Sequence, residues 1–323
     1  MTAIDGGPSD EVRIVRTPTL DDLEQAWQTV RAVLAPTPLV PSPIMHDGSL
    51  KLETFQPTGS FKVRGGLAAV SALAPERRPV TASAGNHGLG IALASTRLGR
   101  GATVVVPEHS SAAKVEALRT YPIELIEHGA DYEAAERYAL ELGAADGNSF
   151  ISPYNDPNVI AGQSTIGREL DSQTSGEVTV VAPVGGGGLL SGLTLWSSSR
   201  PGVHLTGVES SQSRGVSAAV AAGHIVRVPV GDTIADGLAA NLERGSVTPG
   251  LVASVPLVAV DDDELRFAMS WLFSNHGLVA EGSAAAGIAA VLGGKVEVIG
   301  QLVIVVTGRN IAADRYARLI QIS

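Results

Sequence analysis

The sequence predicts an α/β fold with two lobes, each containing a mostly parallel twisted sheet flanked by helices. Short runs of aliphatic residues alternate with runs of helical periodicity from residue 79 to residue 306, a pattern typical of βαβ units. Hydrophobic residues make up 44% of the chain and aromatic residues only 4%. Val, Leu, Ile and Ala must therefore fill the interior, as they do in parallel sheets. A length of 323 residues is sufficient for two lobes.

The first elements follow from local chemistry. Residues 1–16 are polar and contain Gly and Pro, which predicts a loose tail. Helical spacing of apolar residues predicts a helix over 21–34. Residues 35–41 contain three prolines and should be extended, because a residue before proline avoids the α region. Alternating apolar and charged residues predict a strand over 50–55, which the Pro and Gly that follow should end.

The remaining elements alternate along the chain. Strands are expected over 79–82, 102–106, 123–126, 178–182, 205–209, 257–260 and 302–306. Helices are expected over 89–98, 111–120, 132–142, 189–197, 262–275 and 283–292. Proline and glycine clusters near 75–79 and 152–162 mark the limits of a smaller lobe. We therefore expect a small domain over 78–157 and a discontinuous large domain over 1–77 and 158–323.

Composition excludes several classes of function. The formal net charge of −10 argues against a nucleic-acid partner, because phosphate binding needs a basic face. No apolar run reaches the roughly 18 residues of a membrane span, and residues 1–10 show no secretory signal. The absence of cysteine excludes disulfides and thiolate chemistry and fits a cytoplasmic protein.

Lys62 has an unusual position for a lysine. Ser60 occupies the expected N-cap, and apolar residues recur at helical spacing over 63–73, so Lys62 falls in the first turn of a helix that faces a core. The positive end of the helix dipole disfavours an ammonium there and lowers its pKa. A lysine of lowered pKa suits Schiff-base chemistry. The alternative is a lysine whose amine extends to water.

Four consecutive glycines, at 185–188, follow the predicted strand over 178–182 and precede a helix. Their backbone N–H groups can converge on an anion, which the helix dipole also favours. The spacing does not match G-x-G-x-x-G, because Leu190 or Ser191 takes the last place, and no P-loop motif occurs. We interpret this glycine loop as a monophosphate site. The alternative is a tight turn without a ligand.

A second turn, over 83–88, links a predicted strand to a helix. Ser83, Gly85, Asn86 and His87 would offer backbone and side-chain donors at another positive helix end. Such a turn could bind a substrate carboxylate. It could equally be a helix cap in which Asn86 is an ordinary Asx residue.

Taken together, these features resemble the fold-type II pyridoxal-phosphate (PLP) enzymes, specifically the serine/threonine dehydratase and serine racemase family. The resemblance spans residues 37–310. Its most specific motifs are QPTGSFKVRG at 56–65, SAGNHG at 83–88 and GGGGL at 185–189. Supporting stretches are TPL at 37–39, AGQ at 161–163, ADG at 235–237 and TGRN at 307–310.

The resemblance implies a role for each motif. Lys62 would form the Schiff base with PLP and move the α-proton. Asn86 would bind the 3-hydroxyl of the cofactor, and Thr307 would face its ring nitrogen. The implied cofactor-binding residues are Phe61, Lys62, Asn86, Gly185, Gly186, Gly187, Gly188, Leu189 and Thr307. The implied binding site for the substrate carboxylate comprises Ser83, Ala84, Gly85, Asn86 and His87.

The resemblance also implies a reaction. A neutral hydroxyl at Thr307 would not keep the ring nitrogen protonated, which makes the ring a weaker electron sink and favours prompt loss of a β-hydroxyl. The expected activity is α,β-elimination of water from L-threonine or L-serine, giving a 2-keto acid and ammonia, with the cofactor phosphate as acid. The alternatives are β-replacement, racemisation, 3-hydroxyaspartate dehydration and non-catalytic amino-acid binding. A homodimer is also implied.

Some residues depart from the family pattern. Ala84 stands where serine racemases have a second serine, the base on the opposite face, so dehydration is favoured over racemisation. Glu209 matches one cation ligand, but Gly215 replaces the second acidic residue, which leaves a weak monovalent or divalent site at most. Arg309 replaces a glycine and is expected either to tune the ring-nitrogen region or to contact an acidic substrate group. Glu281 matches a family glutamate near the cofactor, or it is simply an acid at a helix N-terminus.

Overall fold

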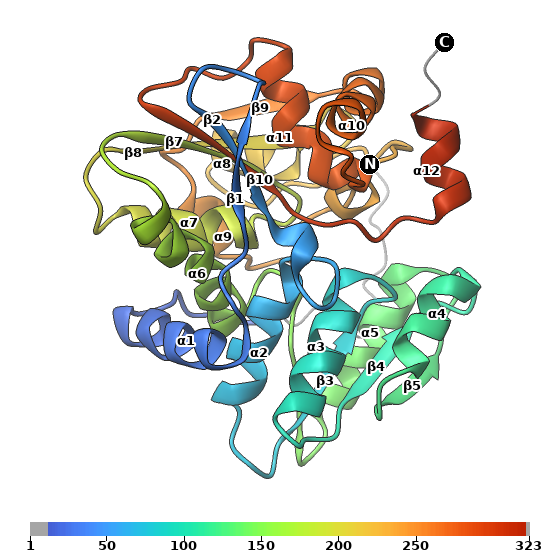
Figure 1. Cartoon of the computed structure of the whole chain (residues 1–323). Helices are drawn as coiled ribbons and strands as arrows, with labels where there is room; N and C mark the ends of the chain where they lie inside the picture. Colours follow the sequence, from blue (N-terminus) through green and yellow to red (C-terminus); the bar gives the residue numbers. More distant parts are fainter. Residues whose placement is uncertain (1–11, 321–323) are drawn as a thin grey trace.

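The protein is described by a computed structural model that covers residues 12–320. Two sheets organise it (Figure 1). The larger has strand order β1-β2-β10-β7-β8-β9 and the smaller β5-β4-β3-β6. All neighbours pair in parallel except β1 and β2, which are antiparallel. This arrangement confirms the predicted α/β class with mostly parallel sheets. The domain limits at 78 and 157 stay a prediction.

The strands of the larger sheet are β1 (Leu39–Ser42), β2 (Gly48–Leu52), β7 (Val178–Pro183), β8 (Val203–Ser210), β9 (Leu257–Val260) and β10 (Gln301–Val306). Those of the smaller sheet are β3 (Arg78–Ala82), β4 (Thr103–Val106), β5 (Glu124–Glu127) and β6 (Asn148–Phe150).

The helices are α1 (Leu20–Val33), α2 (Lys62–Ala72), α3 (Asn86–Arg97), α4 (Ala112–Arg119), α5 (Tyr132–Ala144), α6 (Pro157–Gln173), α7 (Gly188–Ser197), α8 (Gly215–Ala222), α9 (Thr248–Leu251), α10 (Asp262–His276), α11 (Gly282–Leu292) and α12 (Ala313–Leu319). Two short 3₁₀ turns are η1 (Glu53–Phe55) and η2 (Asp236–Leu238). No helix among residues 12–320 is both long and apolar enough to cross a membrane.

The larger sheet is buried on both faces, as the alternation of residues along β10 shows. Leu302, Ile304 and Val306 pack with residues of α10 and α11, whereas Val303 and Val305 pack with residues of α6 and α7. Successive side chains of a strand point to opposite faces, so an uninterrupted aliphatic strand is what a sheet covered on both sides requires.

Several local predictions need correction. The strand expected over 50–55 ends at Leu52 and passes into η1. Ser60 is not an N-cap: Phe61 takes that position, without a capping side chain, and Ser60 instead forms an isolated antiparallel bridge with Gly308. Of the tail expected over 1–16, residues 1–11 lie outside the described part, and residues 12–19 have no regular secondary structure.

The prediction also missed α6, the helix that packs against α1, α2 and α7. The buried face of α6 contains small and polar residues, including Gly162, Gln163, Ser164 and Glu169. A Cβ on Gly162 would lie 2.6 Å from the Arg64 carbonyl oxygen, so the backbones of α2 and α6 touch. Close contact of this kind uses small residues rather than an apolar stripe, which removes the periodic signal. The other elements not predicted are β1, β6, α8, α9 and α12.

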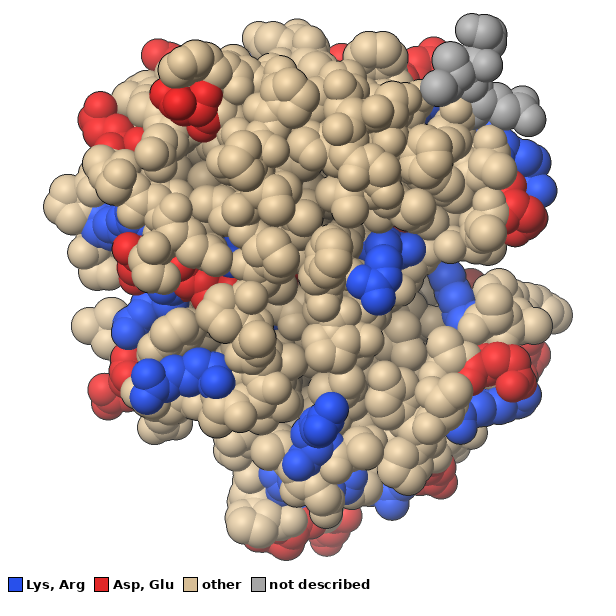
Figure 2. All heavy atoms as spheres, viewed as in Figure 1, with Lys and Arg blue, Asp and Glu red and all other residues tan. Residues whose placement is uncertain are grey.

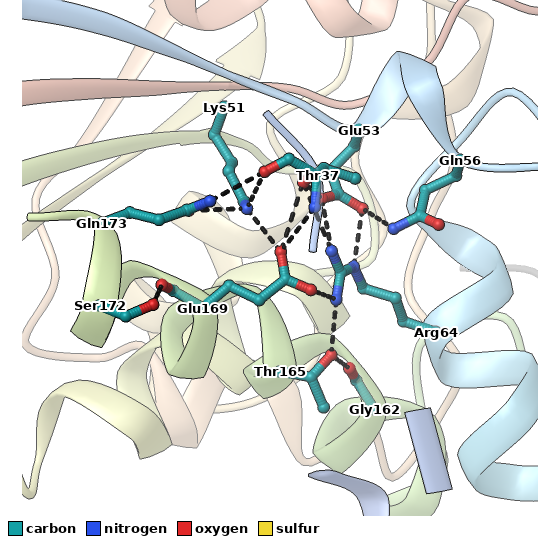
Figure 3. A network of polar contacts seen from close by, with 10 residues as sticks. All are labelled: Thr37, Lys51, Glu53, Gln56, Arg64, Gly162, Thr165, Glu169, Ser172 and Gln173. Atoms are coloured by element: carbon teal, nitrogen blue, oxygen red, sulfur yellow. Dashed lines mark hydrogen bonds and ion pairs between the residues drawn. The ribbon is translucent and has the colours of Figure 1, made fainter. Parts of the chain in front are cut away.

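A buried ionic network anchors the start of α2 (Figure 3). Nε of Arg64 lies 2.7 Å from Glu53, and its Nη1 lies 2.7 Å from Glu169. Nζ of Lys51 lies 2.5 Å from Glu169. The two positive and two negative groups join β2, η1, α2 and α6. Burial opposes the charge on Glu53, but the Arg64 guanidinium outweighs it and lowers the Glu53 pKa, whereas burial lowers the pKa of Lys51 against the pull of Glu169. We call these four residues the ionic network.

Candidate active site

Lys62 is the first residue of α2, in the first turn as predicted, and the residue is half-buried. Nζ donates to the carbonyl oxygen of Pro153 at 2.8 Å and lies 5.3 Å from the centre of the Phe61 ring. Burial lowers the pKa of Lys62 to about 8, and the nearby Glu281 carboxylate opposes the shift. The amine therefore has a much larger neutral fraction than that of an ordinary lysine.

The residue after Pro153 connects this lysine to the glycine loop. A Cβ on Gly186 would lie 2.2 Å from the Tyr154 ring, and one on Gly188 would lie 2.9 Å from the Tyr154 backbone. Pro153 accepts from Lys62, and Tyr154 packs directly on the loop. The Lys62 turn and the glycine loop, far apart in sequence, are thus brought together as predicted.

Three of the four loop glycines are required by close packing and one by its backbone conformation. Gly187 has φ +86°, a value that disfavours any side chain. A Cβ on Gly185 would lie 2.6 Å from the Gly237 carbonyl oxygen. Within the part of the chain that the structure describes, the N–H groups of residues 185–190 donate to no carbonyl or side chain. Free donors at the N-terminus of α7 form a site for an anion.

The 83–88 turn carries a second set of free backbone N–H donors. Gly85 is the N-cap of α3 and has no capping side chain. The N–H groups of residues 86–88 find no acceptor among residues 12–320. A Cβ on Gly85 would meet no atom within 4 Å, so the turn faces open space. Ser83 Oγ accepts from the N–H of Gly85 at 3.2 Å, which holds the turn in shape.

The imidazole of His87 is directed away from this turn. Its Nε2 lies 3.3 Å from the carbonyl oxygen of Ile151, and the residue is only 2% exposed. Burial, helped by the charge of Lys62, lowers the His87 pKa to about 3. The side chain is therefore neutral, and only the backbone of His87 faces the open side of the turn.

Asn86 connects the 83–88 turn to α11. Its Nδ2 donates to Oε1 of Glu281 at 2.7 Å. Burial raises the Glu281 pKa to about 7, with a further increase from Asp236, while the hydrogen bond from Asn86 opposes the change. Glu281 precedes α11 but makes no side-chain capping bond. Its carboxylate belongs to the site and does not serve as an ordinary helix cap.

The other predicted cofactor residues border the same region. Thr307 follows β10, is 4% exposed, and its carbonyl accepts from the N–H of Phe61 at 3.0 Å. The half-buried Phe61 packs against the core cluster that contains Leu189. A Cβ on Gly308 would lie 2.6 Å from Glu281 Oε1. The segment after β10 therefore lies between the Lys62 turn and Glu281.

Glu209 lies elsewhere, at the N-terminus of α8. Its Oε1 accepts from the N–H groups of Val216 at 3.0 Å and Ser217 at 3.2 Å, and its Oε2 accepts from the Ser217 hydroxyl. Both oxygens are thus engaged in capping a helix. No group of three or more His, Cys, Asp and Glu side chains among the described residues could hold a metal ion. The cation site at Glu209 stays a prediction.

Two residues in this region received no role from sequence reasoning. Asn310 donates to Asn86 and lies in the 307–310 stretch that carried the family resemblance, so a signal for it existed. Tyr154 packs on glycines 32 and 34 positions away, a contact for which the local sequence carries no signal.

These residues fit PLP by their donor chemistry. The free N–H groups of 185–190 suit a phosphate, and the Lys62 amine of lowered pKa suits an aldehyde. The region lies between the parts of the molecule that contain the two sheets, and the surface is recessed between these parts on the right of Figure 2. Charged side chains on the face shown form small groups of mixed sign.

Comparison with known proteins agrees with the interpretation of this region as a PLP site. The chain is 37% identical to the L-threonine ammonia-lyase of Thermotoga maritima over 94% of this chain and 78% of that protein. It is 33% identical to the catabolic L-threonine dehydratase of Staphylococcus aureus, covering 94% of this chain and 92% of that one. The structure of maize serine racemase superposes with a TM-score of 0.86 at 29% identity, covering 94% and 97% of the two chains. The model of the pyridoxal-phosphate-dependent enzyme family matches residues 30–308, so the chain belongs to the pyridoxal-phosphate-dependent enzymes.

Proposed function

We propose that the protein is a PLP-dependent ammonia-lyase that converts a 3-hydroxy amino acid such as L-threonine or L-serine to a 2-keto acid and ammonia. The threonine ammonia-lyase and dehydratase among its relatives support this activity. The observation that carries it is the joining of Lys62, through Pro153 and Tyr154, to a glycine loop whose N–H groups are free.

Lys62 would hold the cofactor covalently and move the proton of the substrate Cα. When bound, PLP supplies an electron sink for the electron pair left at that carbon. A pKa of about 8 leaves about a tenth of the amines neutral at pH 7, against fewer than about one in a thousand at the usual pKa. Burial thus prepares the amine as both a nucleophile and a base.

The two sets of free N–H groups would divide the anionic groups between them. The glycine loop, residues 185–189, would bind the cofactor phosphate. The 83–87 turn would bind the substrate carboxylate with the backbone donors of α3, while the buried His87 imidazole stays neutral. Asn86 would bind the ring hydroxyl of the cofactor, Phe61 would pack near the ring, and Thr307 would face the ring nitrogen.

Ala84 favours elimination over racemisation. Racemisation needs a proton donor and acceptor on each face of Cα, and a methyl group cannot supply one. The neighbouring hydroxyl, on Ser83, accepts from the N–H of Gly85 and so takes part in the turn itself. We therefore expect keto acid without interconversion of enantiomers, although serine racemase is a structural neighbour.

The test is a panel of L-threonine, L-serine, D-serine and L-3-hydroxyaspartate, incubated with the PLP-loaded protein. Keto acid, ammonia and enantiomer ratio are measured together. Keto acid and ammonia in equal amounts from L-threonine or L-serine, with an unchanged enantiomer ratio, support the proposal. Interconversion without ammonia would instead identify a racemase, and a preference for 3-hydroxyaspartate would identify an acidic-substrate dehydratase that uses Arg309.

Three further features complete the proposal. We propose a homodimer, which the family resemblance implies, and a cytoplasmic location, which a chain without cysteine fits. A cation at Glu209 would have to displace the Ser217 hydroxyl and two backbone N–H groups. Light scattering of the holoenzyme tests the dimer. Assays in chelator with added K⁺ or Mg²⁺ test the cation, and we expect changes of less than about threefold, because the carboxylate already has donors.

A further inference from the structure

A chain of hydrogen bonds crosses the site, with the side-chain amide of Asn310 at its centre. Nδ2 of Asn310 donates to the backbone carbonyl of Thr58 at 2.8 Å and to Oδ1 of Asn86 at 2.6 Å. Nδ2 of Asn86 donates in turn to Glu281 at 2.7 Å. The chain therefore runs from a backbone carbonyl, through two amides, to a carboxylate. Its side chains come from the segment after β10, the start of α3 and the residue before α11.

The Thr58 end of this chain fixes its direction. A backbone carbonyl can only accept, so the Asn310 atom that faces Thr58 must be the NH₂ group. The same NH₂ group faces Asn86, so the Asn86 atom opposite it must be the carbonyl oxygen, and the NH₂ group of Asn86 then faces Glu281. Because the Glu281 pKa is about 7, its carboxyl group can accept or donate near neutral pH and does not fix the Asn86 amide by itself.

The number of amide hydrogens already engaged shows which of the two asparagines can donate to a ligand. Asn310 has two amide hydrogens, and Thr58 and Asn86 take both. Asn86 also has two, of which Glu281 takes one. The second has no acceptor among residues 12–320. Asn310 therefore has no donor left for a ligand, whereas Asn86 has one.

Asn310 is held firmly against the turn that carries Lys62. Gly59 has φ +75°, and a Cβ there would lie 2.3 Å from Asn310 Oδ1, so only glycine leaves room for this amide. The N–H of Arg309 donates to the Gly59 carbonyl at 2.9 Å, and Ser60 bridges to Gly308. The position of Asn310 is thus set by contacts with the backbone of residues 58–60.

We propose that Asn310 is a positioning residue, which orients the Asn86 amide so that Asn86 presents an N–H group to the ring hydroxyl of PLP. The inference rests on the proposed function, in which Asn86 contacts that hydroxyl. Without Asn310, the Asn86 amide can rotate and turn its carbonyl toward the cofactor, with the loss of a hydrogen bond. The competing explanation is that Asn310 only anchors the turn over residues 58–61.

A double-mutant cycle on cofactor affinity separates the two explanations. Apoprotein is titrated with PLP, and the dissociation constant is read from absorbance for the wild type, Asn310→Ala, Asn86→Ala and the double variant. We expect each single variant to weaken binding about 10-fold, which is about 1.4 kcal/mol. In the Asn86→Ala background, Asn310→Ala should add less than about twofold. Additive losses, or an Asn310→Ala protein that binds like the wild type, would overturn the inference.

Two further variants keep the test decisive. Asn148→Ala is the control, because Asn148 Nδ2 donates to a backbone carbonyl at 2.9 Å in a half-buried position of the smaller sheet. It should lower Tm without changing cofactor affinity. Asn310→Asp keeps the shape but sets an acceptor against Asn86, so it should weaken PLP binding even where Asn310→Ala does not fold. Unchanged affinity in Asn310→Asp counts against the inference, whereas a wild type that fails to bind PLP counts against the proposed function.

Discussion

The ionic network, which is buried, and the lysine site, whose residues Lys62, Asn86 and Glu281 are half-buried, both involve the start of α2 and are built in opposite ways. Arg64, Glu53, Glu169 and Lys51 are each within 4% of complete burial, and every charge has a partner of opposite sign. Lys62, two residues before Arg64, forms no ion pair among residues 12–320, and its amine donates to the neutral carbonyl of Pro153. Glu281 has an amide partner and a pKa of about 7.

This difference shows how the fold separates stability from chemistry. The paired charges connect β2, η1, α2 and α6, and the Arg64 guanidinium lowers the pKa of Glu53. Groups left without charged partners keep pKa values near neutrality, where proton transfer is most efficient. The network therefore supplies rigidity to the start of α2, and the site next to it keeps donors and an amine available for ligands.

The largest effect should come from the reactive amine. Lys62→Ala removes the group that holds the cofactor and moves the proton, so keto-acid formation should fall by more than about 10³-fold. Because Lys62 makes no ion pair among the described contacts, Tm of the apoprotein should change by only a few degrees. Activity within about tenfold of the wild type would contradict the role of Lys62.

A change in the ionic network should mainly lower the free energy of unfolding, whereas Lys62→Ala mainly lowers activity. Arg64→Met leaves Glu53 and Glu169 buried without their main partner, which should cost about 3–5 kcal/mol in the free energy of unfolding. Urea unfolding of the apoprotein measures this loss. Arg119→Met removes two exposed ion pairs and serves as the control, with an expected change much smaller than that of Arg64→Met, because solvent screens exposed pairs. Equal losses for the two variants would refute the proposed division of roles.

For the glycine loop, we predict the effect of one substitution and its partial reversal by a second. Gly186→Ala places a methyl group 2.2 Å from the Tyr154 ring, so the loop must shift and PLP affinity should fall about 10- to 100-fold. Tyr154→Ala in the same chain removes the clash and should restore part of the affinity. Gly250→Ala, whose Cβ would meet no atom within 4 Å, should bind PLP normally. A Gly186→Ala protein with normal affinity would show that the loop is not the phosphate site.

The smallest effect concerns pH. The Glu281 pKa is raised from 4.5 to about 7 in the folded protein, so its contribution to stability is complete below pH 4.5 and is lost as pH rises toward 7. Lys62 has the opposite sign: its pKa is lowered from 10.5 to about 8, so stability increases as pH rises from 8 to 10.5. Glu281→Gln should therefore remove the part of the stability loss of the apoprotein between pH 4.5 and 7 that the titration of Glu281 causes. Parallel curves for the two proteins would show that Glu281 titrates normally.

Sequence reasoning was accurate where a signal is local. Aliphatic runs marked β7 and β10, and Lys62 was placed at a helix start from the turn residues before it. The 83–88 turn and the glycine loop were found because open donors at a helix N-terminus need glycines and small polar residues. Each of these features is set by neighbouring residues in the chain.

The errors arise where distant segments decide the structure. Lys51 and Glu53 alternate with leucines, which indicates a strand with one face in water, but both are 0% exposed because Arg64 and Glu169 pair with them. Glu53, a member of this network, is also the first residue of η1. Helix α6 was missed because its contacts are backbone contacts at Gly162. Pairing partners and close contacts of this kind cannot be found from local periodicity.

The most direct test of the account is chemical reduction of the PLP-loaded protein with borohydride, followed by peptide mass mapping. The chain has four lysines, Lys51, Lys62, Lys114 and Lys295, so the labelled position can be assigned without ambiguity. We predict a single pyridoxyl label, on Lys62, and its loss in Lys62→Ala. A protein that takes up no label, or that carries it on any of the other three lysines, would contradict the account.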